Sequence, residues 1–165
     1  MKFVIDTHKA GYVGRLSYTL EEYSFDFCLE ASTHGVTSLI VNDLQLEIDE
    51  EQHVLCAWGL CPHPTWGVMS GGPPPFFRGG LEVLLDGKVI PGVSHRLTAP
   101  ATWPAYVNWE TGWVCLGDAT ADGSVQAVEF ATNTVAVLKD EALVALWLRA
   151  DNLGDLRKAA HASSK

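Results

Sequence analysis

The chain has 165 residues, of which 47% are hydrophobic and 19% charged, and no apolar run reaches the roughly 18 residues of a membrane-spanning helix. This composition excludes intrinsic disorder, and the length suits a single domain over residues 1–165 whose core needs neither disulfides nor metal. The 11 basic residues against 20 acidic ones give a net charge of −9, which disfavours nucleic acids and anionic membrane surfaces as partners.

The first six residues form a short apolar run that stops at Asp6. A secretory signal has an apolar stretch of about 7–15 residues, so we expect a cytoplasmic protein. Cysteines remain reduced in that compartment. Free thiols are therefore expected at Cys28, Cys56, Cys61 and Cys115.

The negative charge is concentrated in one segment. No Lys or Arg occurs from residue 16 to residue 77, whereas nine acids do. The other segments hold 11 acids and 11 bases, so the whole net charge comes from this acidic segment. Acidic side chains keep a protein in solution, and they also form a surface that attracts a basic protein or a cation. Both explanations stay open.

Residues 23–30 show a strict alternation of apolar and polar side chains, which predicts a half-buried strand. A competing pattern overlaps it, because Thr19 and Glu22 form a capping box and Gly35 would end a helix over residues 20–34. Phe and Tyr favour sheet, so we prefer the strand.

Residues 44–48 alternate in the same way, and an acidic turn at 50–52 leads into an apolar run over 53–58. The strongest hairpin signal lies at residues 81–90, where Asp86 and Gly87 suit the positive φ angles of a type I′ turn. Both patterns predict antiparallel pairs of strands.

Residues 59–80 predict a long loop rich in proline, glycine and aromatic side chains. Five of the eight prolines lie between residues 62 and 75, and proline cannot donate a hydrogen bond to a sheet. The loop either caps one end of the core or acts as a lid or binding loop.

A second aromatic-rich stretch lies at residues 103–113 and turns into an apolar run at 114–116. Its large side chains either fill one end of the core or line a pocket for a small molecule. The candidate pocket residues are Trp103, Tyr106, Trp109 and Trp113.

The last third predicts a meander of three strands, over residues 125–130, 135–138 and 143–148. The third run is apolar on both faces, which indicates a central strand or a buried helix. Residues 151–165 predict a short helix, with Asp151 as its N-cap, and a frayed tail. About nine short strands together predict an all-β fold, an antiparallel β-sandwich or barrel.

Signals for catalysis and metal binding are weak. Four residues of zinc-binding types lie close in sequence: His53, Cys56, Cys61 and His63. The first two are three apart on a strand and would point to opposite faces, so we expect no metal and no cofactor. No serine-nucleophile elbow and no phosphate-binding loop occurs. The candidates for moving a proton are His63, Glu110 and, as an alternative, His95.

Two functions are compatible with these observations. The first is an acidic protein-binding domain, such as an immunity- or antitoxin-type inhibitor of a basic partner. Its charges would come from Glu47, Asp49, Glu50 and Glu51, and its apolar anchors from Trp58, Trp66, Phe76 and Phe77. The second is a small β-barrel that binds or converts an apolar molecule in the aromatic pocket. The charge asymmetry favours the first, and self-association is compatible with either.

Overall fold

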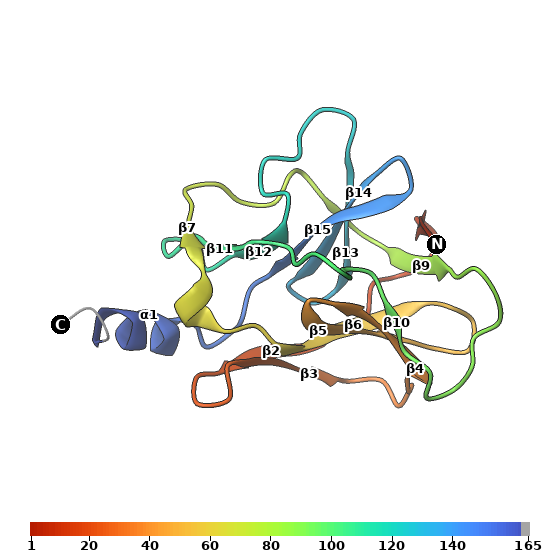
Figure 1. Cartoon of the computed structure of the whole chain (residues 1–165), viewed down its shortest axis with the longest axis horizontal. Helices are drawn as coiled ribbons and strands as arrows, with labels where there is room; N and C mark the ends of the chain where they lie inside the picture. The colour runs from red at the N-terminus through yellow and green to blue at the C-terminus, as the bar shows by residue number, and fades with distance from the viewer. Residues whose placement is uncertain (163–165) are drawn as a thin grey trace.

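The computed structural model describes residues 1–162 and consists of two large β-sheets, a two-stranded ribbon and one helix (Figure 1). The lower sheet in Figure 1 has six strands. In spatial order they are β10 (His95–Arg96), β4 (Thr37–Val41), β5 (Asp43–Ile48), β6 (Val54–Leu60), β3 (Ser24–Leu29) and β2 (Gly14–Thr19).

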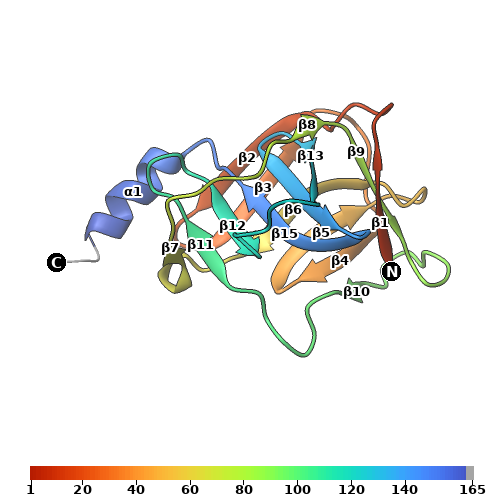
Figure 2. The same ribbon diagram turned by 90° about the horizontal axis from the view of Figure 1, so that it is seen from above.

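The upper sheet has seven strands. In spatial order they are β7 (Gly67–Val68), β11 (Ala105–Val107), β12 (Val114–Gly117), β15 (Ala142–Leu148), β14 (Thr134–Lys139), β13 (Gln126–Ala131) and β8 (Phe77–Arg78). The ribbon pairs β1 (Lys2–Asp6) with β9 (Gly80–Leu84). It lies at the opposite end of the molecule from helix α1 (Leu153–Ala162), as Figure 2 shows. A short 3-10 turn, η1 (His63–Thr65), follows β6.

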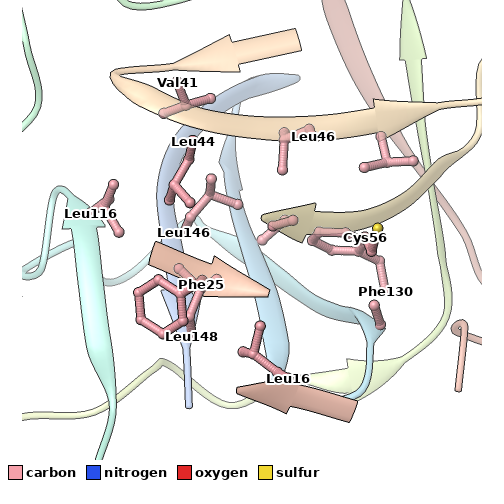
Figure 3. Close-up of a cluster of buried hydrophobic side chains, with 14 of the residues drawn as sticks. Leu16, Phe25, Val41, Leu44, Leu46, Cys56, Leu116, Phe130, Leu146 and Leu148 are labelled. Carbon is pink, nitrogen blue, oxygen red and sulfur yellow. The ribbon is translucent and has the colours of Figure 1, made fainter. Parts of the chain in front are cut away.

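The main core fills the space between the two large sheets (Figure 3). Leu44 and Leu46 from β5 face Leu146 and Leu148 from β15, and all four side chains are fully buried. Burying such a side chain contributes about 1.5–3 kcal/mol relative to leaving it exposed, so the alternating leucines hold the sheets together. The fold is therefore all-β, as the sequence predicts, and its two stacked sheets make it a sandwich.

The strand preferred for residues 20–34 is confirmed at β3. Phe25 is fully buried against the core while Asp26 and Cys28 are exposed, which is the alternation of a strand with one wet face. The meander is confirmed at β13, β14 and β15. β15 lies between β12 and β14 and is covered on both faces, which explains its continuous apolar run.

The predicted hairpin at residues 81–90 is wrong. β9 ends at Leu84, and β1 pairs along its whole length from Lys2 opposite Leu84 to Asp6 opposite Gly80. The N-terminal strand thus takes the edge that the second hairpin strand would occupy. Asp86 binds the N-terminal ammonium group at 2.7 Å, and only Gly87 of the two turn residues has a positive φ.

Residues 1–162 form 15 strands, whereas the patterns predict about nine. The surplus includes β7, β8 and β10, which have two residues each and pair in parallel with an edge of a large sheet. Such short edge pairings come from loops that pass beside a sheet, and they leave no alternating pattern in the sequence. The predicted C-terminal helix is confirmed, and it begins at Leu153. Asp151 is wrong as its N-cap, because it lies two residues before the helix and its carboxylate accepts the Asn133 side-chain amide. Of the tail predicted to fray at residues 162–165, Ala162 ends the helix and residues 163–165 lie outside the described residues.

Candidate functional site

Trp58 stands on the outer face of the six-stranded sheet, with 37% of its surface exposed. It lies opposite Gln45 of β5, whose neighbours Leu44 and Leu46 point into the core. Asp43 and Glu47 share this outer face with Gln45, because side chains two apart on a strand point the same way. Asp43 and Glu47 are therefore the diagonal neighbours of Trp58 on β5.

A third acid, Asp26, lies on β3, the strand on the other side of β6. Ser24 of β3 is opposite Leu60, and Phe25 is opposite Gly59. Asp26 follows this pairing and is exposed, and its carboxylate accepts the Thr19 hydroxyl of β2 at 3.0 Å. The outer face of the six-stranded sheet thus presents an exposed aromatic ring among three acids and the half-exposed Leu60. We call this surface the Trp58 face: Asp26, Asp43, Gln45, Glu47, Trp58 and Leu60.

Within residues 1–162, no carboxylate between positions 16 and 77 forms an ion pair with Lys or Arg. The base that approaches acids of this region is His53, near Asp49 and Glu51. Arg15 and Arg96 sit on the two edge strands of the sheet. The first lies 3.6 Å from Asp151 and the second donates to the carbonyl of Asn42 at 3.0 Å. The Trp58 face therefore carries an uncompensated negative field.

A cavity of about 370 Å³ adjoins the Trp58 face. Asp43 and Leu60 belong to both, and Trp103 and Pro104 form part of the cavity wall. Asn42 fixes that wall, because its side chain accepts the N–H of Trp103 at 2.8 Å and donates to its carbonyl at 2.9 Å. The cavity is thus preformed, with apolar walls and one carboxylate.

The other predicted acids lie on the turn between β5 and β6, and some of them serve the fold. The Asp49 carboxylate accepts the N–H of Glu51 at 2.9 Å and of His53 at 2.8 Å. It also lies 3.1 Å from the His53 ring, whose other nitrogen is 3.4 Å from Glu82. Glu50 is exposed and has no such contact in the described part of the chain.

Glu47 has a role in the fold besides its place on the Trp58 face. Its carboxylate accepts the N–H of Gly35 at 2.8 Å and lies 3.5 Å from the Cys56 thiol. Burial raises the pKa of that thiol, and the Glu47 charge raises it further. A charge reversal at Glu47 or Asp49 would therefore disturb the hairpin as well as the surface charge.

The four predicted aromatic anchors do not lie on one surface. Trp58 is on the Trp58 face, whereas Trp66 is only 9% exposed and packs in the main core. Phe76 and Phe77 are exposed, but they lie at the edge of the seven-stranded sheet, where Phe77 begins β8. Phe76 contacts the Trp113 ring at a centroid distance of 6.2 Å.

The four predicted pocket aromatics are divided as well. Trp103 lines the cavity beside the Trp58 face, and Tyr106 lines a second hollow near Val68. Trp109 packs against Trp66 at a centroid distance of 6.4 Å. Trp113 belongs to a second apolar cluster, on the outer face of the seven-stranded sheet.

His63 lies in a cluster of aromatic rings at the end of β6. Its Nδ1 is 3.4 Å from the Tyr18 hydroxyl, and its ring lies 5.4 Å from that of Tyr23. Burial lowers the pKa of His63, so the imidazole is neutral at neutral pH and can accept a proton. Burial also raises the pKa of the Tyr18 hydroxyl, which leaves Tyr18 protonated.

The neighbouring Cys61 does not supply a nucleophile. Its thiol is buried and accepts the Trp66 indole N–H at 3.3 Å. Burial raises the pKa of Cys61 to about 12, so the thiolate form is scarce at neutral pH. His63 therefore stands without an activated partner.

The two remaining candidates for proton transfer lie elsewhere. Glu110 is exposed in the turn before β12, where its backbone N–H donates to Asn108 at 2.9 Å. His95 is on the edge strand β10, and its Nε2 is buried without a hydrogen-bond partner in the described structure. Among residues 1–162, no group of three or more His, Cys, Asp or Glu side chains is arranged to hold a metal ion.

Comparison with known proteins adds no functional information: the chain matches no family model, no curated protein and no solved structure. Within the described residues, no helix has the length and apolar character needed to cross a membrane. The functional argument therefore rests on the geometry of the chain itself.

Sequence reasoning missed Asp26, Asp43 and Leu60 as members of the site. The signal for two of them is present in the sequence, because pairing the strands on either side of the turn at residues 50–52 brings Asp43 opposite Leu60. Asp26 needed the pairing of β3 with β6, which are separated by two other strands along the chain.

Proposed function

We propose that this protein binds a basic protein partner through the Trp58 face. The observation that carries the proposal is an exposed tryptophan on a sheet face that also carries Asp26, Asp43 and Glu47, in a region without Lys or Arg. Tryptophan is the aromatic residue that best attracts a Lys or Arg side chain to its ring face. Exposed carboxylates around it would steer a cationic partner and raise the association rate by about 10- to 1000-fold at low salt.

A basic enzyme is the class of partner that best matches this charge. An inhibitor of the immunity or antitoxin type would cover the cationic active-site surface of a nuclease with acids and anchor itself through a central aromatic side chain. The large acidic excess of the chain, −9, supports this use over a purely structural one.

The experiment is affinity capture from native lysate at low salt, with a salt gradient for elution and mass spectrometry to identify the retained proteins. The variants are Trp58→Ala and Asp43→Asn, and the matched control is Asp140→Asn. Asp140 is exposed in the turn between β14 and β15, and its positive φ of 50° suits asparagine.

We expect a basic protein that the wild type and the control retain and that Trp58→Ala releases. With that protein purified, Trp58→Ala should weaken Kd about 30-fold, since aromatic hot spots contribute about 2 kcal/mol or more. Equal retention by all variants, or an affinity that does not change with salt, contradicts the proposal.

A second candidate function is the binding of a small apolar molecule, favoured by the cavity that Trp103, Leu60 and Leu116 help to line. Hydrophobic ligands would then quench tryptophan fluorescence, and salt would change their affinity little. A diverse ligand panel without any quenching contradicts this second candidate.

A further inference from the structure

Two further hollows adjoin the cavity beside the Trp58 face. These hollows, of about 480 and 420 Å³, lie along the segment from Trp103 to Tyr106. All three hollows share Pro104 as a wall, and the last two also share Gly117 and Asp118. We call these three hollows the Pro104 groove.

The floor of the groove is held rigidly. The carbonyl of Pro104 accepts the N–H of Gly117 at 2.9 Å, and β11 pairs with β12 directly beyond it. Gly117 has a φ of +101°, and a Cβ there would meet the carbonyl of Val144 at 2.4 Å and the Trp103 ring at 2.9 Å. Glycine thus allows Trp103 to lie directly on the sheet, so the groove needs no rearrangement to receive a ligand.

The groove is lined by apolar and uncharged polar residues and by two acids. Asp43 lines the hollow next to the Trp58 face, and Asp118 lines the other two. Hydrogen bonds from Thr120 hold the pKa of Asp118 below its usual range, and Lys139 is the cation that adds to this effect. None of the residues that line the three hollows is Lys, Arg or His. The lining therefore complements a chain that carries separated positive charges.

We propose that the Pro104 groove binds an extended segment of the basic partner, with one Lys or Arg at Asp43 and another at Asp118. The aliphatic stems of these side chains would pack on Trp103, Pro104 and Val144, while their charged ends reach the carboxylates. A small cation would fill only one hollow, whereas three adjoining hollows with two separate acids match a polypeptide. This inference rests on the proposed function and adds the form of the ligand.

The test uses dye-labelled decapeptides that contain two arginines separated by two to six apolar or proline residues. Fluorescence anisotropy at low salt gives their Kd for the wild type, Asp118→Asn and Val144→Lys, with Asp140→Asn as the control. Asparagine keeps the side-chain oxygen that caps Thr120, and Val144→Lys places a positive charge inside the groove. Circular dichroism checks that each variant is folded.

We expect one arginine spacing to bind best, with Asp118→Asn weakening Kd about two- to fivefold and Val144→Lys at least about tenfold. The control should bind as the wild type does. Equal binding at all spacings, unchanged binding by Val144→Lys, or equally tight binding of a single blocked arginine would overturn the inference. If Trp58→Ala weakens the binding of the captured partner while Val144→Lys does not, the proposed role of the groove is wrong and the proposed function stands. If Trp58→Ala has no effect on that partner, the proposed function fails.

Discussion

The two large sheets each have a face turned away from the shared core, and the chain treats these faces differently. On the seven-stranded sheet the outer face carries Trp113 and Trp147, and both are buried. The segments around Met69 and from Ala119 to Val125 pack over this cluster. On the six-stranded sheet the outer face carries Trp58, which stays exposed among acids.

The chain itself covers the aromatic side chains on the outer face of the seven-stranded sheet, whereas it leaves Trp58 on the six-stranded sheet exposed. Phe76 covers Trp113 on one side, and the Arg149 guanidinium carbon lies 5.1 Å from the centroid of the Trp113 ring. Trp58 has none of these partners within the described chain, and the acids on its face, Asp26, Asp43 and Glu47, form no ion pair with Lys or Arg there. The exposed ring and the acidic surroundings are the features on which the proposed partner-binding face rests.

The largest expected difference between the two outer faces is in how much a tryptophan stabilises the fold. Trp147→Ala should lower the free energy of unfolding by about 3–5 kcal/mol, because it empties a fully packed position in the covered cluster. Trp58→Ala should cost less than about 2 kcal/mol, since part of that ring already faces water. Urea denaturation followed by circular dichroism measures both. Equal losses would show that Trp58 serves the fold as Trp147 does.

A smaller difference in stability is expected between Asp49, which accepts hydrogen bonds in the turn, and the exposed Glu50. Asp49→Ala should destabilise the protein by about 1–3 kcal/mol, because two backbone N–H groups and His53 lose their acceptor. Glu50→Ala, one residue away and exposed, should change stability by less than about 0.5 kcal/mol. Thermal unfolding of the two variants side by side checks this, and a larger loss for Glu50→Ala would contradict it.

The smallest effect is pH-dependent and lies at His63. Burial lowers the pKa of His63 in the folded state, so the unfolded chain binds its proton more readily. The folded state is therefore fully favoured above the ordinary value of 6.5 and loses stability as the pH falls through the lower, folded pKa. Unfolding free energies between pH 7.5 and 5 should decline less steeply for His63→Gln. An unchanged slope would place the titrating group elsewhere.

The fold class followed from local patterns, since strands such as β3 and β5 alternate with period two and bury one face. The pairing at β9 did not follow, because the Asp86-Gly87 turn signal is local whereas the competing strand β1 lies about 80 residues away along the chain. Competition between two distant strands for one edge of β9 cannot be recognised from the local sequence.

The candidate site was predicted in part. Glu47 and Trp58 come together as expected, whereas Trp66 is drawn into the core by Tyr18 and Phe25. Composition identified the acidic segment correctly as a sequence feature, but it could not tell Asp49, which caps a turn, from Asp43, which faces solvent. That distinction needs the positions of backbone N–H groups, which only the folded turn supplies.

The most direct test of the central claim follows the six tryptophan indole N–H signals by NMR during titration with an arginine-rich decapeptide. The Trp58 and Trp103 signals should shift, while those of Trp113 and Trp147 stay unchanged because the chain itself covers them. An unmoved Trp58 signal, or shifts of Trp113 and Trp147 as large as that of Trp58, would contradict the account.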